Sequence, residues 1–147
     1  MTEDVTRRDW MGLLARAPAA RLKALWQEAG TAPDFAWLRA PEAGAVMVRG
    51  RAGATGAPFN LGEMTVTRCS LRLASGEVGH AYVQGRDRDK ARIAALVDAL
   101  MQTAAASRLR GAVLEPLAAA QAEARRDRAA RSAATKVEFF TMVRGDD

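Results

Sequence analysis

Apolar side chains at helical spacing mark two short helices at the start of the chain. They recur every three or four positions, first at Trp10, Leu13, Leu14 and Ala17, then at Leu22, Leu25 and Trp26. Thr6 is suited to cap the first helix, Pro18 to open the second, and Gly30 to end it in a left-handed conformation. We therefore predict an N-terminal helical hairpin over residues 5–30.

Alternating apolar and polar positions then predict a sheet over residues 44–85. Residues 45–51 and 63–73 alternate in this way, and residues 78–84 return as a third strand after a turn. Short connections of this kind favour an antiparallel meander with one apolar face under helices and one polar face. Four arginines are expected on the polar face: Arg49, Arg51, Arg68 and Arg72.

Two further helices are expected after the strands. Residues 87–107 open on Asp87, a good capping residue, and carry apolar side chains at the spacing of a helix that covers a sheet. Residues 112–134 form an arginine-containing helical arm, and no apolar side chain larger than alanine occurs in residues 118–135. Such an arm either stands in solvent or lies across another subunit, and composition alone favours solvent.

The last segment, residues 136–144, alternates as a strand that is apolar on both faces. Phe139 falls on one side of it, and Phe140 and Met142 fall on the other. Such a strand must be covered twice, either by helices of its own domain or by a partner on one face. The subunit-interface candidates are therefore Phe139, Phe140, Met142 and Arg144.

These elements predict a single α+β domain over residues 1–147. It comprises the helical hairpin, the antiparallel meander, two later helices and a C-terminal strand. Residues 31–44 are expected to be a connection, because Pro33 and Pro41 restrict helix formation. Hydrophobic residues make up 49% of the chain, enough for a core, although alanine supplies much of that content.

Positive charge gathers in the middle of the chain. The formal net charge is +5, and residues 44–86 hold five basic side chains against two acidic ones. The same stretch has a glycine-rich loop whose backbone amides, with nearby guanidinium groups, suit a phosphate or an acidic partner. The candidates for this contact are Arg49, Arg51, Gly53, Thr55, Gly56, Arg68 and Arg86. The glycine spacing fits neither common nucleotide-binding motif, and a flexible surface loop is the reading that composition alone favours.

The chain offers little catalytic or metal-binding chemistry of its own. Its one cysteine, Cys69, and one histidine, His80, are too few for a zinc or iron–sulfur site, so no catalytic or metal-binding residue is predicted. Cys69 falls on the apolar strand face, where a buried, inert thiol is expected. Aromatic residues lie mostly outside the basic stretch, which disfavours nucleic-acid binding. Without a secretion signal or an apolar run long enough for a bilayer, a cytoplasmic, non-membrane protein is expected.

Six blocks in order along the chain resemble the G subunit of the bacterial carbon–phosphorus lyase core complex. The most specific block is FFTMVRGD at residues 139–146, because eight consecutive residues of mixed chemistry rarely coincide. The others are Trp10-Met11 with Leu14-Ala15, RAPEAG at 39–44, the loop from Arg51 to Arg68, Gly85-Arg86-Asp87, and DALMQ at 98–102. Together the blocks span nearly the whole chain.

The resemblance implies a subunit role in organophosphonate catabolism. The family supports formation of α-D-ribose 1-methylphosphonate 5-triphosphate from ATP and methylphosphonate, which are substrates of the assembly with the other core subunits. Zinc and iron–sulfur chemistry is expected only on partner subunits, and the isolated chain is expected to be inactive. The resemblance also favours a helical arm that lies across another subunit. The alternative is a stand-alone phosphate- or nucleotide-binding enzyme that uses the arginine-flanked glycine loop.

Overall fold

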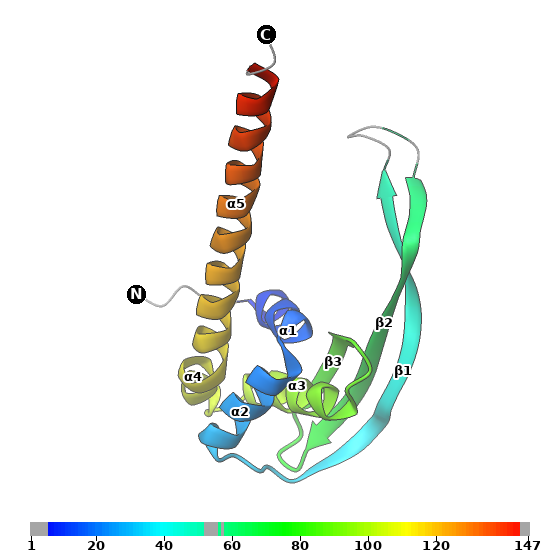
Figure 1. Cartoon of the computed structure of the whole chain (residues 1–147). Helices are drawn as coiled ribbons and strands as arrows, with labels where there is room; N and C mark the ends of the chain where they lie inside the picture. Colours follow the sequence, from blue (N-terminus) through cyan, green and yellow to red (C-terminus); the bar gives the residue numbers. More distant parts are fainter. Residues whose placement is uncertain (1–5, 52–55, 57, 145–147) are drawn as a thin grey trace.

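The computed structural model describes residues 6–51, 56 and 58–144, and its α+β fold confirms the predicted class. Two helices precede a three-stranded antiparallel sheet along the chain, and the remaining helices follow it (Figure 1). The elements are α1 (Arg7–Arg16), α2 (Ala19–Ala29), β1 (Phe35–Arg51), β2 (Pro58–Leu73), β3 (Val78–Gln84), α3 (Arg88–Leu100), α4 (Ala106–Leu109), the π-helical turn η1 (Arg110–Leu114) and α5 (Glu115–Arg144). None of the helices in these described ranges has the length and hydropathy of a membrane-spanning segment.

The two N-terminal helices begin and end where the sequence predicts. Thr6 caps α1 in a capping box, in which its hydroxyl accepts from the Asp9 amide and the Asp9 carboxylate accepts from the Thr6 amide. Gly30 ends α2 with a φ of 64°, the left-handed conformation that glycine adopts without strain. The apolar stripes of both helices are buried, and both helices contact α3.

Strand β2 lies between β1 and β3, and the side chains on its inner face belong to the hydrophobic core. Cys69, Leu71 and Leu73 are at most 4% exposed and lie in one cluster with the apolar side chains of α3. Residues 31–34 form a connection, but β1 starts at Phe35, so the expectation that the connection extends to residue 44 is wrong. An edge strand tolerates Pro41 where a central strand would not, and the pairing register shifts between Arg39 and Glu42, around this proline.

Helix α3 is the centre of the fold and is buried on nearly all sides. The sheet contacts one side of it and α1 and α2 contact the others, so most of its residues are inaccessible to solvent. It ends at Leu100, before the predicted residue 107. Thr103 donates from its hydroxyl to the Leu100 carbonyl at 2.6 Å, a local bond that competes with helix continuation.

The predicted C-terminal strand over residues 136–144 is wrong, because α5 runs as a helix to Arg144. A strand needs a neighbouring strand to pair with, whereas a helix that is already formed adds residues at little cost. The helix carries this segment away from the sheet body (Figure 1). The alternating pattern therefore reflects apolar composition and not an extended conformation.

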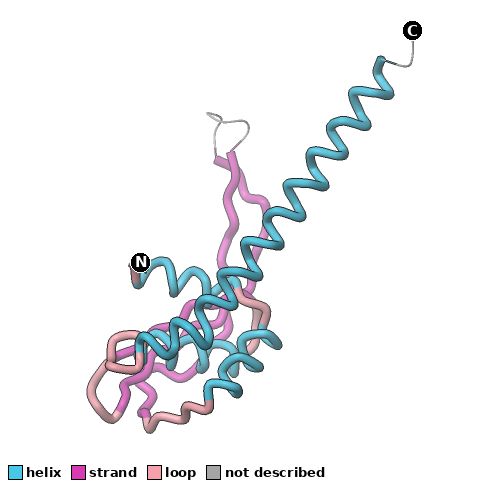
Figure 2. The backbone as a smooth tube through the Cα atoms, turned by 90° about the vertical axis from the view of Figure 1, so that its left-hand side faces the viewer, coloured by secondary structure: helices cyan, strands magenta, loops and turns pink. Residues whose placement is uncertain are grey.

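Two elements project from the body toward the same side (Figures 1 and 2). Strand β3 pairs only with Val66–Arg72 of β2, so residues 45–51 and 58–65 continue beyond it as a two-stranded distal ribbon. Helix α5 continues beyond α1, and every residue from 123 to 135 is exposed. We call residues 123–144 the free arm.

Two polar side chains on α3 fix α1 and β3 against it. Near one end, the fully buried Asp98 carboxylate accepts from Arg7 Nη2 and Trp10 Nε1, both at 2.8 Å, and from the His80 backbone amide at 2.8 Å. This hydrogen bond from the guanidinium group to Asp98 raises the pKa of Arg7. The Asp98 carboxylate therefore joins the start of α1 to β3.

Lys90 performs the corresponding role two turns earlier on α3. Its Nζ donates to the Ala15 carbonyl at 3.0 Å and to the Gln84 carbonyl at 3.2 Å, at the ends of α1 and β3. Burial lowers the pKa of Lys90. The two side chains together set the positions of three elements along their lengths.

Asp98→Ala is expected to destabilise the protein by about 3 kcal/mol, because it leaves buried donors of Trp10 and His80 without an acceptor. Asp89→Ala on the same helix is the matched control. Its carboxylate is exposed and pairs only with Arg92, so a change within about 0.5 kcal/mol is expected. Urea unfolding followed by circular dichroism measures both, and equal losses would contradict the role of Asp98.

Gly79→Ala is expected to cost about 2–3 kcal/mol through overpacking between β3 and α3. A Cβ built on Gly79 would lie 2.0 Å from the Ala95 carbonyl oxygen, a distance that only backbone movement relieves. Gly111→Ala is the control, since nothing lies within 4 Å of its Cβ position and alanine favours a helix. Thermal unfolding should show a lower Tm for the first variant and an equal or higher Tm for the second.

Candidate functional site

The arginines that the sequence suggested as one group lie far apart along the sheet. Arg49 pairs with Asn60 toward the tip of the distal ribbon, whereas Arg68 pairs with Glu42. Along β1, Arg49 is seven residues from Glu42, the partner of Arg68. This separation corresponds to roughly 23 Å at about 3.3 Å per residue. Arg49 and Arg68 therefore do not converge on one phosphate.

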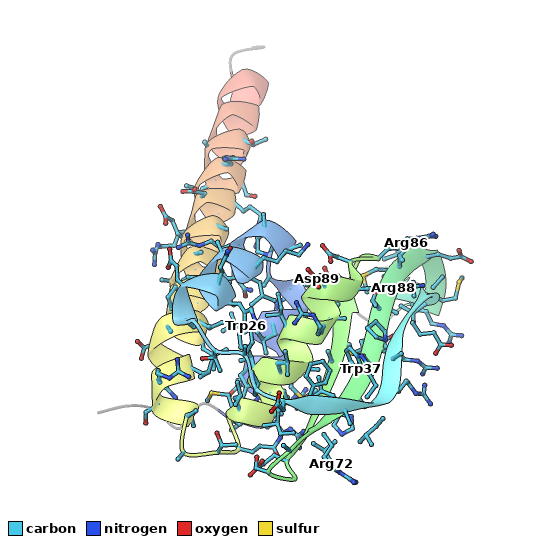
Figure 3. All side chains as sticks on the ribbon, turned by 90° about the horizontal axis from the view of Figure 1, so that it is seen from below. Trp26, Trp37, Arg72, Arg86, Arg88 and Asp89 are labelled. Carbon is cyan, nitrogen blue, oxygen red and sulfur yellow. The ribbon has the colours of Figure 1, made fainter. Side chains whose placement is uncertain are left out.

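The remaining loop candidates are placed only in part. Arg51 is the last residue of β1, Gly56 is a half-buried bend, and Gly53 and Thr55 lie outside the described residues. Arg86 is exposed in the turn between β3 and α3, and Figure 3 shows it near Arg88 at the start of that helix.

Arg68 lies beside a shallow pocket of about 320 Å³ on the outer face of the sheet. Tyr82 is directly across from it on β3, and Val66 and Val46 contribute apolar lining. The nearest carboxylate oxygen, from Glu42, is 4.0 Å from Arg68 Nη2, and both side chains are more than half exposed. Exposed pairs of this kind contribute little, so Arg68 remains available to an incoming anion or acidic side chain.

Cys69 and His80 lie on opposite faces of the sheet and form no nucleophile–base pair. The Cys69 thiol points into the core and donates to the Ala91 carbonyl at 3.3 Å. Burial raises its pKa to about 11. His80 is exposed, and its Nδ1 lies 2.8 Å from the Ser70 hydroxyl. The prediction of a buried thiol on the apolar strand face is confirmed.

The distal ribbon and the adjoining part of β1 expose large apolar side chains. Leu38, Met47 and Leu61 are 52%, 49% and 62% exposed. Leu61 lies over Gly50, where an added Cβ would come within 3.0 Å of its methyl group. Trp37 is also exposed and packs edge-on against Phe35, with the ring centroids 5.1 Å apart.

The C-terminal interface candidates lie on the free arm of α5. Their backbone is helical, so Phe140 and Arg144 are one helical turn apart and lie closer together than they would in an extended strand. Phe139 and Met142 are likewise separated by about one turn. The candidates therefore remain together on one element, although in a different arrangement from the one predicted.

A second basic site, which the sequence analysis missed, lies where α5 passes α1 and α2. A cleft of about 570 Å³ there is lined by Arg16, Arg21, Arg125 and Arg128. These side chains come from positions more than 100 residues apart in the sequence, so their contact is a product of the tertiary fold. The only signal in the sequence was Leu117 followed at helical spacing by Gln121 and Arg128, a stripe that indicates one packed side at the start of the arm.

Metal-binding side chains do not gather in the ranges that the structure covers. No three His, Cys, Asp or Glu residues lie together there as potential ligands. The candidate sites of the described chain are thus the pocket at Arg68, the exposed ribbon and arm, and the cleft at the base of α5.

Comparisons with known proteins connect this chain to phosphonate metabolism. The family model described as phosphonate metabolism protein PhnG matches residues 5–145. A protein of Rhizobium meliloti (strain 1021), named alpha-D-ribose 1-methylphosphonate 5-triphosphate synthase subunit PhnG, is 49% identical over 141 residues. The alignment covers 96% of this chain and 90% of that protein.

Cys69 is expected to resist thiol reagents in the native protein. With a pKa of about 11, its thiol is almost wholly protonated at pH 8, and the thiolate is the reactive form. A pKa raised above the ordinary value of 9.0 also means that protonation stabilises the fold fully below about pH 9, and that this contribution is lost as the pH rises through 11.

The measurement is the rate of reaction with 5,5′-dithiobis(2-nitrobenzoate) at pH 8, with and without urea. We expect at least a hundredfold faster labelling of the unfolded chain. Comparable rates in the two states would show that the thiol is not enclosed as described.

Proposed function

Because the chain belongs to the family of phosphonate metabolism protein PhnG, we propose that it is a subunit of the synthase that forms α-D-ribose 1-methylphosphonate 5-triphosphate. In this proposal the other core subunits of the carbon–phosphorus lyase complex are its partners in the cytoplasm. ATP and methylphosphonate are substrates of the whole assembly. Zinc and iron–sulfur chemistry belongs to partner subunits, and this chain contributes binding surfaces.

The observation that carries the proposal is the pair of projecting elements. In α5, all residues from 123 to 135 are exposed to solvent. An exposed helical stretch of this length is only marginally stable by itself in water, even with many good helix formers. A partner that packs along the free arm would stabilise it.

The distal ribbon provides the second contact surface. Among the described residues, neither of its edges pairs with a third strand. β1 is an edge strand of the sheet, and β3 pairs with β2 only as far as Val66. Met47 and Leu61 add exposed apolar area beside these open backbone groups. Strand edges of this kind pair readily with a segment of another chain. We therefore propose that partner segments lie along the ribbon and the free arm.

The arginines of the sheet have a supporting role in this proposal. Arg68, with its weak partner Glu42, and Arg49 nearer the ribbon tip are candidates for contact with an acidic partner surface or with phosphate. The alternative of a stand-alone enzyme built on the glycine loop is less favoured. It would need Arg49 and Arg68 at one site, and they lie at different levels of the ribbon.

Charged substitutions on the two projecting elements are expected to prevent assembly. Met47→Asp with Leu61→Asp tests the ribbon, and Phe140→Asp with Met142→Asp tests the free arm. When the chain is co-expressed with the other synthase subunits, each double variant should reduce co-purification and synthase activity at least tenfold. Burying a carboxylate in an apolar interface carries a large desolvation cost.

Ala104→Asp, in an exposed turn of the body, is the matched control and should assemble normally. Because Met47 and Leu61 are already exposed, the ribbon variant should keep its Tm within about 2 °C. Intact assembly by both double variants would refute the proposed role of the projecting elements.

A further inference from the structure

The cleft at the base of α5 gathers four guanidinium groups from three helices. Arg16 comes from the end of α1, Arg21 from the first turn of α2, and Arg125 and Arg128 from α5. Figures 1 and 2 show how α1 and α2 lie beside the lower half of α5. Gln84, from the end of β3, lines the same cleft.

These four arginines have no carboxylate partner among the described residues. None of them takes part in an ion pair or a side-chain hydrogen bond there, and neither Asp nor Glu lines the cleft. Arg16 and Arg125 also line an adjoining hollow of about 460 Å³, where the one acidic side chain, Asp9, is engaged by Thr6 in the α1 cap. Like charges held together in a concave site create a positive potential that attracts anions.

The walls of the cleft are fixed by the fold. Leu117 is 1% exposed and anchors the start of α5 in the core. Gln121, one turn further, donates from its side chain to the Leu13 carbonyl at 3.1 Å and so holds α5 against α1. The Lys90 ammonium group donates to the carbonyls of Ala15 and Gln84. Ala15 precedes Arg16 in the chain, and Gln84 itself lines the cleft. All four arginines extend from helices and not from loops, and the two from α1 and α2 are on helices packed against the core, which favours a preorganised site.

We propose that this cleft binds an oligophosphate chain, such as that of a nucleoside triphosphate. Guanidinium groups bind phosphate oxygens in a bidentate manner, and four of them match the roughly four negative charges of a triphosphate near neutral pH. The volume of about 570 Å³ lies within the range of small-molecule sites.

The four guanidinium groups come from three helices and surround one cleft. This arrangement suits a small polyanion better than an acidic protein segment that lies along α5. The site goes beyond the proposed assembly role. A subunit can dock through the ribbon and through the part of the free arm beyond Arg128 without it.

Titration calorimetry of the full-length chain with inorganic tripolyphosphate and with ATP tests the inference. We expect a Kd in the tens of micromolar at low salt, and a loss of at least tenfold in the double variant Arg16→Gln/Arg125→Gln. Arg16→Lys/Arg125→Lys keeps the charge but not the bidentate geometry, and its affinity should lie between the two. Circular dichroism and the Tm verify that each variant is folded.

The matched control is Arg72→Gln/Arg88→Gln. It removes the same net charge from exposed positions outside the cleft, which Figure 3 labels. Retained affinity in this control supports a specific site. No binding at millimolar tripolyphosphate, or an equal loss in the control, overturns the proposal. Tighter binding of a polyglutamate peptide than of tripolyphosphate also overturns it and assigns the cleft to an acidic protein segment.

Discussion

The fold depends on the buried carboxylate of Asp98 and on the way α3 uses it with Lys90. A buried carboxylate without partners would be very costly, and here it accepts hydrogen bonds from a guanidinium group, an indole and a backbone amide. Lys90, two turns away, donates to carbonyls at the opposite ends of the same two elements. Helix α1 and strand β3 are therefore aligned with α3 at two points each, and apolar packing fills the space between them. The contacts of Lys90 also position part of the cleft at the base of α5. Gln84 accepts one of its hydrogen bonds, and Arg16 follows Ala15, which accepts the other.

Much of the core could be read from hydrophobic spacing alone. The inner positions of β2, the apolar stripes of α1 and α2, and the buried thiol of Cys69 follow from periods of two and three to four residues. Two segments could not be read in this way. Pro41 restricts helix formation and led to the prediction of a connection, yet it lies in β1, an edge strand whose register shifts around it. Phe139 and Phe140 suggested an alternating strand, whereas the helix upstream continues through them to Arg144.

The candidate sites show a similar division. Arginines close together in the sequence separate in space because an extended ribbon places each residue about 3.3 Å further on. Arg49 and Arg68 are on facing strands but at different levels for this reason. The cleft arginines, in contrast, are remote in sequence and meet only because Leu117 and Gln121 dock α5 on the body. Local patterns predict such docking poorly, since one partly apolar turn in an alanine-rich helix is a weak signal.

The exposed stretch from 123 to 135 has a consequence for the lifetime of a single copy of this protein. Every residue of this stretch is exposed, so its helix opens more easily than the core helices do. Four arginines in this stretch, at 125, 126, 128 and 131, provide cleavage positions for trypsin-like proteases whenever the backbone opens. If a partner covers the arm as proposed, a copy without that partner is expected to be cleaved faster than an assembled one.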